Sequence, residues 1–146
     1  MLGLGAGSAV EILNKKCAWP IEITAIEFDE DLIAFARDEF EIERFGNLKI
    51  ITADAIEWIK NNTGIKYDLI IDDLFIDDQM PSACLEKEYL AGVSGLLNDK
   101  GIYFRNTMNT SEITIQTYNS YLETIYKKVS FCRAKGYENL IYLCYN

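Results

Sequence analysis

The chain has 146 residues, the length of a single domain, of which 49% are apolar and 25% charged. This composition excludes an intrinsically disordered protein. The 14 basic and 23 acidic residues give a net charge of −9, which would repel a phosphate backbone, so we expect no nucleic-acid partner. Because the chain contains no histidine, acid–base chemistry falls to carboxylates, tyrosine, lysine or cysteine.

Membrane and metal partners are not expected either. No segment approaches the roughly 18 consecutive apolar residues of a membrane helix, and the start of the chain lacks the basic region of a signal peptide, so we expect a cytoplasmic protein. Four scattered cysteines (Cys17, Cys84, Cys132 and Cys144) would all have to converge to bind zinc. We therefore expect reduced thiols and no metal, although Cys132 and Cys144 can face each other in a hairpin.

The first half of the chain is predicted to alternate helices and strands. After a glycine loop at 3–7, these elements are expected at residues 8–16, 21–28, 30–40, 48–52 and 54–61. Ser8 and Glu11 have the spacing of a capping box for the first helix, and Asp54 with Glu57 has N-terminal capping spacing for the last.

The second half continues the alternation and ends in a hairpin. Elements are expected at residues 69–71, 82–97, 102–104, 115–125, 129–134 and 140–145. The apolar run 69–71 is typical of a strand buried on both faces. We therefore expect one three-layer, Rossmann-like α/β domain over residues 1–146, with a mostly parallel sheet and an antiparallel C-terminal hairpin. Only two residues precede Gly3, so we expect the first strand to be truncated.

Open α/β sheets bind ligands beyond the carboxyl ends of their strands, and glycines cluster at one such end. Gly3, Gly5 and Gly7 allow the backbone to approach a ligand closely, although a tight strand-to-helix turn has the same composition. The NAD-binding pattern requires a further glycine where this chain has Ser8, and the spacing fits Gly-x-Gly-x-Gly better.

Two carboxylates follow the next two predicted strands. Glu27 closes the strand at 21–28 and is placed to accept hydrogen bonds from a ribose diol, unless it is only an exposed charge. Asp54 follows the strand at 48–52, where it can accept from an adenine amino group, cap the next helix, or do both.

A third acidic group follows the buried strand at 69–71. It consists of Asp72, Asp73, Asp77 and Asp78. Neighbouring carboxylates at a strand end are suited to general-base chemistry and attract a cationic amine. A solvated acidic loop would show the same charge pattern.

Several segments match a known family in order. They are the glycine loop at 3–8, Ala-Ile-Glu-Phe-Asp at 25–29, Thr-Ala-Asp-Ala at 52–55 followed by Trp-Ile at 58–59, Tyr-Asp-Leu-Ile-Ile-Asp-Asp at 67–73, and later echoes at Pro81, 88–89 and 97–101. Together they resemble the spermidine synthase-like branch of the class I S-adenosylmethionine-dependent methyltransferase fold. The resemblance implies that S-adenosylmethionine, or its decarboxylated form, binds at Gly3, Gly5, Ala6, Gly7, Glu27, Asp54, Ala55 and Asp73. It also implies that Asp73 is the catalytic residue, assisted by Asp72.

Three departures from that branch bear on the reaction. At the position of Ala6, polyamine synthases carry an aspartate. In that family the aspartate is held to bind the amine of the aminopropyl donor, and it would repel the carboxylate of S-adenosylmethionine. The family's second acid after the fourth strand is shifted here to Asp77 or lost. The N-terminal β-domain of spermidine synthases is absent from this chain.

Three functions follow as alternatives. The first is methyl transfer from S-adenosylmethionine to a small-molecule acceptor, and the second is aminopropyl transfer to a cationic amine, giving a polyamine. The third is a non-catalytic nucleotide-binding or interaction domain, since a fold does not guarantee activity. Six tyrosines after residue 117 are compatible with a homodimer interface, although half-buried packing explains them better.

Overall fold

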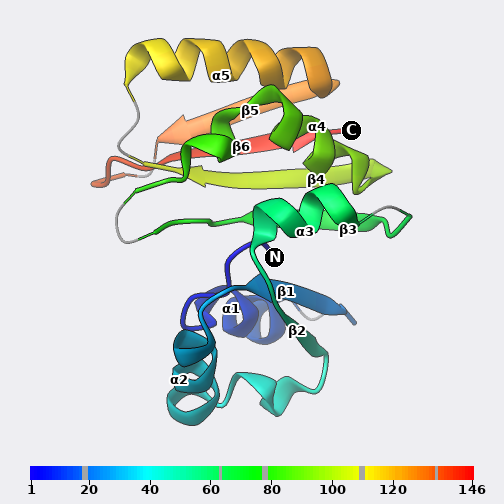
Figure 1. Ribbon diagram of the computed structural model, residues 1–146, viewed down its shortest axis with the longest axis vertical. Coiled ribbons are helices and arrows are strands. Elements are labelled where there is room, and N and C mark those ends of the chain that lie inside the picture. The colour runs from blue at the N-terminus through cyan, green and yellow to red at the C-terminus, as the bar shows by residue number, and fades with distance from the viewer. Residues whose placement is uncertain (18–19, 63, 77–78, 109–110, 134) are drawn as a thin grey trace. The chain divides into compact units, whose positions relative to one another are not determined.

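The computed structural model describes residues 1–17, 20–62, 64–76, 79–108, 111–133 and 135–146 (Figure 1). The acidic residues Asp77 and Asp78, singled out in the sequence, lie outside these ranges. Where the sequence predicted one domain, the contacts of the chain define two compact units, residues 1–55 and 56–146. Each unit is described below by itself.

The first unit contains three helical segments and two strands. They are α1 (Ser8–Lys16), β1 (Ile23–Glu27), α2 (Glu30–Phe40), the 3-10 helix η1 (Ile42–Phe45) and β2 (Leu48–Thr52). β1 and β2 are parallel, with Ile23 opposite Leu48 and Glu27 opposite Thr52. Leu2 forms an isolated parallel bridge with Ile26. The predictions for α2 and β2 are confirmed, whereas β1 is shorter than predicted at both ends.

Apolar side chains from each of these segments form the core of the first unit. The buried members are Leu4, Val10, Ile23, Ala25, Ile33, Ala36 and Ile42. In α2, Ile33 and Ala36 are three residues apart and therefore share one helix face. Asp29 begins this helix, because its side chain accepts hydrogen bonds from the backbone N–H groups of Asp31 and Leu32, both at 3.0 Å.

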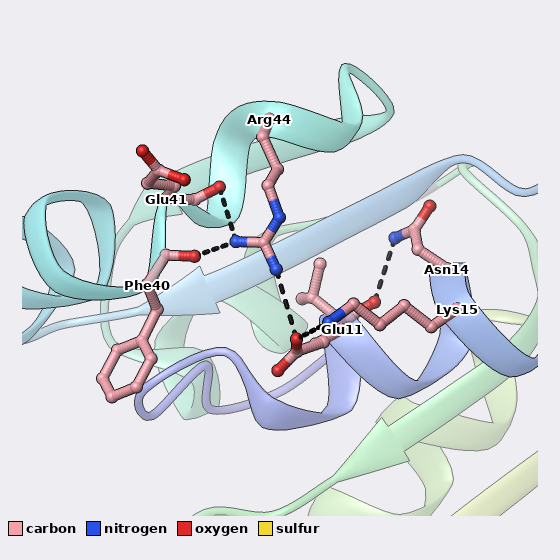
Figure 2. A network of polar contacts seen from close by, with 7 residues as sticks. Glu11, Asn14, Lys15, Phe40, Glu41 and Arg44 are labelled. Atoms are coloured by element: carbon pink, nitrogen blue, oxygen red, sulfur yellow. Dashed lines mark hydrogen bonds and ion pairs between the residues drawn. The ribbon is translucent and has the colours of Figure 1, made fainter.

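The start of α1 differs from the prediction of a capping box. Gly7 precedes the helix with φ of 85°, Ser8 is already its first helical residue, and no side chain caps it. Glu11 instead forms ion pairs with Lys15 and, at 3.2 Å, with Arg44 of η1 (Figure 2). The hydrogen bond and charge of Lys15, with a smaller effect of Arg44, lower the pKa of Glu11. Glu11 therefore links α1 to η1.

The second unit is a mixed sheet with helices. Its elements are β3 (Tyr67–Asp72), the 3-10 helix η2 (Ser82–Leu85), α4 (Lys87–Gly95), β4 (Leu97–Thr107), α5 (Glu112–Ile125), β5 (Lys128–Arg133) and β6 (Leu140–Tyr145), preceded by α3 (Ala55–Asn61). The strand order is β3-β4-β6-β5. β3 is parallel to β4, and β6 is antiparallel to both β4 and β5. The predicted antiparallel hairpin is thus confirmed, and Figure 1 shows α5 alongside it.

The single helix predicted at 82–97 is wrong. Glu86 has extended backbone angles (φ −79°, ψ 148°) and separates η2 from α4. β4 then begins at Leu97 rather than at Ile102. Residues 98–101, which the prediction left between the helix at 82–97 and the strand at 102–104, lie inside β4, where the register with β3 shifts between Tyr67 and Leu69. The glycine and polar residues of this segment form an irregularity in the ladder, which is a common use of such residues in strands.

β3 is not buried on both faces, contrary to the prediction. Ile70 is 4% exposed, but Leu69 is 42% exposed. Among the described residues β3 pairs with a strand on one side only, β4, so it is an edge strand of the second unit. An edge strand does not need the continuous burial that the apolar run suggested.

The cysteines do not pair in the hairpin. Cys132 lies opposite Ile141, and Cys144 lies opposite Val129, so the two cysteines do not face each other. All four thiols are free. In the described part of the chain, no three acidic or cysteine side chains are arranged to hold a metal ion. No helix there has both the length and the apolar character required to cross a bilayer.

Candidate functional site

The glycine loop, residues 3–7, connects Leu2, which forms a bridge with Ile26 of β1, to the start of α1. Its glycines have left-handed backbone conformations. Gly3, Gly5 and Gly7 have φ of 81°, 54° and 85°. A Cβ at Gly7 would lie 2.4 Å from Cγ2 of Ile42, whereas a Cβ at Gly5 would meet nothing within 4 Å. Gly7 therefore serves packing, and exposed Gly5 leaves its backbone open to close approach by a ligand.

The Glu27 carboxylate organises this loop. It is 7% exposed at the end of β1. Its Oε2 accepts hydrogen bonds from the backbone N–H groups of Leu4 (3.0 Å) and Gly5 (3.4 Å). Its Oε1 accepts from those of Phe28 (2.9 Å) and Asp29 (3.1 Å). Because an ionised carboxylate offers about four acceptor sites, these bonds occupy it, and direct recognition of a ribose diol stays a prediction.

Ala6, Asp54 and Ala55 lie near the same loop in the first unit. The backbone N–H of Ala53 donates to the carbonyl of Glu27 at 2.9 Å, which places the turn after β2 beside Glu27. Asp54 is exposed and directly precedes α3, while Ala55 is 6% exposed and is its first residue. Ala6 is half-buried. Adenine recognition by Asp54 and Ala55 stays a prediction.

In the second unit, Asp72 is the centre of a buried polar cluster with Tyr89, Tyr103 and Arg105, called the Asp72 cluster below. Asp72 and Arg105 are both fully buried, are paired in register between β3 and β4, and form an ion pair. The other carboxylate oxygen accepts from the hydroxyls of Tyr89 (2.6 Å) and Tyr103 (2.7 Å). This geometry makes Asp72 a structural group of the core.

Burial and charge fix the protonation of the groups around Asp72. Desolvation, followed by the negative charge of Asp72, raises the pKa of Tyr89 and of Tyr103 well above 10. Desolvation opposes the charged form of Arg105, yet the carboxylate of Asp72 keeps its pKa above the ordinary value. Desolvation also raises the pKa of the Cys84 thiol to about 11. The tyrosines therefore donate to Asp72 as neutral phenols throughout the neutral range.

Asp73, which the resemblance pairs with Asp72 in catalysis, has the opposite environment. It is exposed, and its Oδ1 accepts a hydrogen bond from the side-chain amide of Asn106 at 2.9 Å. Asn106 in turn accepts from the amide of Asn139, also at 2.9 Å. β3 ends at Asp72, whose side chain lies in the core, whereas Asp73 follows the strand and lies at the surface. Of the two carboxylates, Asp73 is the accessible one.

Sequence reasoning missed Arg105, Asn106 and Asn139. Arg105 follows buried Tyr103 by two residues in β4 and so occupies an inward position. A charged side chain at an inward position requires a buried counter-charge. That alternation in 102–107 was the available signal. No local pattern indicates the amide chain from Asn139 to Asp73, because the three residues are far apart in sequence.

In the described part of the second unit, two pockets lie at opposite ends of the sheet. The larger, of about 660 Å³, lies between α3 and α4 and reaches Lys66 and Leu96, which precede β3 and β4. The smaller, of about 480 Å³, includes Thr107 at the carboxyl end of β4. Ligands of open α/β sheets bind at the carboxyl ends of strands, so the smaller pocket is the better placed for chemistry.

Comparisons with known proteins agree with this architecture. A family model described as "Methyltransferase domain" matches residues 2–139. A polyamine aminopropyltransferase of Vibrio vulnificus is 29% identical over 116 residues, which are 77% of this chain and 38% of that protein. The chain thus spans well under half the length of this curated relative.

Two solved structures are similar in fold. Human Methyltransferase-like protein 13, in complex with SAH, has a TM-score of 0.87 at 22% identity, covering 98% of this chain and 68% of that one. Spermidine synthase from Thermotoga maritima has a TM-score of 0.74 at 15% identity, covering 99% and 52%. The chain therefore belongs to the methyltransferase-domain family and has the α/β class I fold of S-adenosylmethionine-dependent methyltransferases.

Proposed function

We propose that the chain is a transferase that binds S-adenosylmethionine and moves its methyl group to a small-molecule acceptor. The observation that carries this proposal is the glycine loop, which the Glu27 carboxylate holds by its backbone N–H groups at Leu4 and Gly5. Space is open where a Cβ at Gly5 would project. The residues present thus fit a cofactor that approaches the loop backbone closely.

The side chain at position 6 favours methyl transfer. Polyamine synthases of the branch that this sequence resembles carry an aspartate there, which would repel the carboxylate of S-adenosylmethionine. Two like charges about 4 Å apart repel by about 1 kcal/mol in water and about 4 kcal/mol at an effective dielectric constant of 20. Ala6 removes this repulsion, so the intact cofactor is acceptable.

In this mechanism Asp73 acts on the acceptor. When bound, S-adenosylmethionine would supply an electrophilic methyl group on a positively charged sulfur, with a neutral thioether as the leaving group. Asn106 holds one oxygen of Asp73, and Asp73 Oδ2 accepts a hydrogen bond from the N–H or O–H of the acceptor. Asp73 thereby orients the lone pair that forms the new bond and takes the released proton. General-base catalysis of this kind contributes about 10²- to 10⁴-fold in rate.

Aminopropyl transfer is the second candidate. The curated relatives, from Vibrio vulnificus and Neisseria meningitidis, are named polyamine aminopropyltransferases. In that reaction the decarboxylated cofactor would bind better than S-adenosylmethionine, and the acceptor would be an amine.

A panel of cofactors distinguishes the candidates. We expect S-adenosylmethionine and its demethylated product to raise the melting temperature, and NAD to leave it unchanged, because a ligand at 100 times its Kd stabilises a protein by about 2.7 kcal/mol. Ala6→Asp should weaken the binding of S-adenosylmethionine at least about fivefold, the factor that corresponds to about 1 kcal/mol. If the decarboxylated cofactor binds more tightly to the unmodified chain, aminopropyl transfer is favoured instead.

Two variants test the residues. Glu27→Gln places an amide N–H against backbone donors and should weaken S-adenosylmethionine binding about tenfold or more, whereas Glu22→Gln, an exposed acid just before β1, should not. Asp73→Asn should lower turnover by about 10²- to 10⁴-fold. Equal turnover of Asp73→Asn and the unmodified chain would refute the role of Asp73.

A further inference from the structure

The smaller pocket of the second unit lies where three strand ends and one helix start meet. Its lining is Thr107, Met108, Ser111, Ile115, Arg133, Glu138 and Leu140. Thr107 ends β4, Arg133 ends β5 and Leu140 begins β6, so all three lie at the same edge of the sheet. A volume of about 480 Å³ falls in the range of pockets that hold small molecules.

The amide chain that holds Asp73 also fixes the wall of this pocket. Asn106 directly precedes Thr107, and Asn139 lies between Glu138 and Leu140. The hydrogen bonds from Asn139 to Asn106 and from Asn106 to Asp73 are both 2.9 Å. A second contact, from the Thr107 hydroxyl to the carbonyl of Leu140 at 2.9 Å, is buried. Pocket and carboxylate are therefore parts of one rigid edge of the sheet.

Among the described side chains that line the pocket, one is a cation, Arg133, and one is an anion, Glu138. Arg133 is exposed, and its Nη1 donates a long hydrogen bond, of 3.5 Å, to the backbone carbonyl of Glu138. Within the described residues neither side chain takes part in an ion pair. A guanidinium group with free donors matches a carboxylate in a bidentate geometry. Glu138 supplies the complementary acceptor for an ammonium group.

We propose that this pocket binds the acceptor and that the acceptor is a small zwitterion of the amino-acid class, with its carboxylate on Arg133 and its ammonium group toward Glu138. The assignment of the pocket to the acceptor rests on the proposed transferase function. The charge argument does not depend on that function. A diamine would bring a second positive charge against Arg133, and a dicarboxylate would bring a second negative charge against Glu138. The acceptor therefore differs from the diamines that a polyamine synthase uses.

Three probes of equal length test the charge pattern. They are 4-aminobutanoate, butane-1,4-diamine and butanedioate. Each is titrated into the full chain and followed by calorimetry, with and without saturating SAH, the demethylated product of S-adenosylmethionine. We expect 4-aminobutanoate to bind at least tenfold more tightly than either of the others. Arg133→Gln should weaken its binding about tenfold, which corresponds to about 1.4 kcal/mol, and Glu138→Gln should also weaken it. Lys135→Gln changes an exposed cation of the same hairpin and should have no effect.

Each other outcome overturns the proposal. Tighter binding of the diamine or of the dicarboxylate, binding unaffected by Arg133→Gln, or no binding of any probe contradicts a zwitterion site. Binding of SAH in the same titrations reports on the transferase function separately. If SAH binds and the zwitterion does not, only the acceptor proposal fails. If the zwitterion binds and SAH does not, the transferase function fails, and with it the naming of this ligand as the acceptor.

Discussion

The Asp72 cluster makes a quantitative prediction about stability. Asp72 and Arg105 are both fully buried, and removal of one partner of a buried ion pair costs about 3–5 kcal/mol. Arg105→Met leaves the carboxylate with donors from Tyr89, Tyr103 and the backbone N–H of Leu74. Asp72→Asn instead leaves a buried guanidinium without its counter-charge. We therefore expect Asp72→Asn to lower the free energy of unfolding by about 5 kcal/mol and Arg105→Met to lower it by about 3 kcal/mol.

Urea unfolding of the two single variants and the double variant measures these costs. The double variant should cost less than the sum of the singles, by a coupling energy of about 2 kcal/mol, because neither charge is then left alone. Asp73→Asn is the matched control: the same substitution one residue later, at an exposed side chain, should change stability by about 0.5 kcal/mol or less. If Asp72→Asn costs no more than Asp73→Asn, or if the singles are additive, the assignment of Asp72 to a coupled buried pair is wrong.

Two further predictions concern pH and the glycine loop. Burial raises the pKa of the Cys84 thiol from 9.0 to about 11 and that of the Cys144 thiol from 9.0 to about 12. As pH rises above 9, these thiols therefore lose their protons in the unfolded state before they do so in the folded state. The free energy of unfolding should then fall, by about 2 to 3 kcal/mol for Cys84 alone. Urea titrations from pH 7 to 11 check this, and a constant stability across that range contradicts it. Gly7→Ala should destabilise by about 2–4 kcal/mol, because a strained left-handed backbone adds to the overlap with Ile42. Gly5→Ala, in open space, should cost only about 1 kcal/mol, so a larger loss for Gly5→Ala in the same urea assay would contradict the packing role of Gly7.

Much of the fold follows from local pattern, and the failures have local causes. The helix at 30–40 and the strand at 48–52 were predicted with their bounds, because apolar spacing and capping residues agree there. The helix predicted at 82–97 failed because its apolar periodicity continues across Glu86, whose extended backbone no nearby glycine or proline indicates. The capping box failed because Gly7, in a left-handed conformation, supplies the turn one residue before Ser8.

The candidate site was less predictable than the fold. Position at strand ends was enough to single out Glu27, Asp72 and Asp73. The sequence did not reveal that Glu27 is occupied by backbone donors of the loop or that Asp72 is paired with Arg105, since each depends on a partner more than 20 residues away. Because β3 ends at Asp72, strand alternation does not extend to Asp73, and the burial of Arg105 in β4 is what identifies Asp72 as the inward carboxylate.

Because the chain contains no histidine, the environments of its carboxylates decide which of them can take part in acid–base chemistry. Acid–base work at neutral pH then falls first to carboxylates, and the structure distinguishes among those singled out from the sequence. Asp72 is fully buried with both oxygens engaged, and both oxygens of Glu27 already accept hydrogen bonds from backbone N–H groups. Asp73 is exposed at the carboxyl edge of the sheet, and an amide chain fixes its orientation. A positioned, accessible carboxylate is what transfer to a nucleophile requires, so we propose that the reaction depends on Asp73, while its neighbour Asp72 is a buried group of the core.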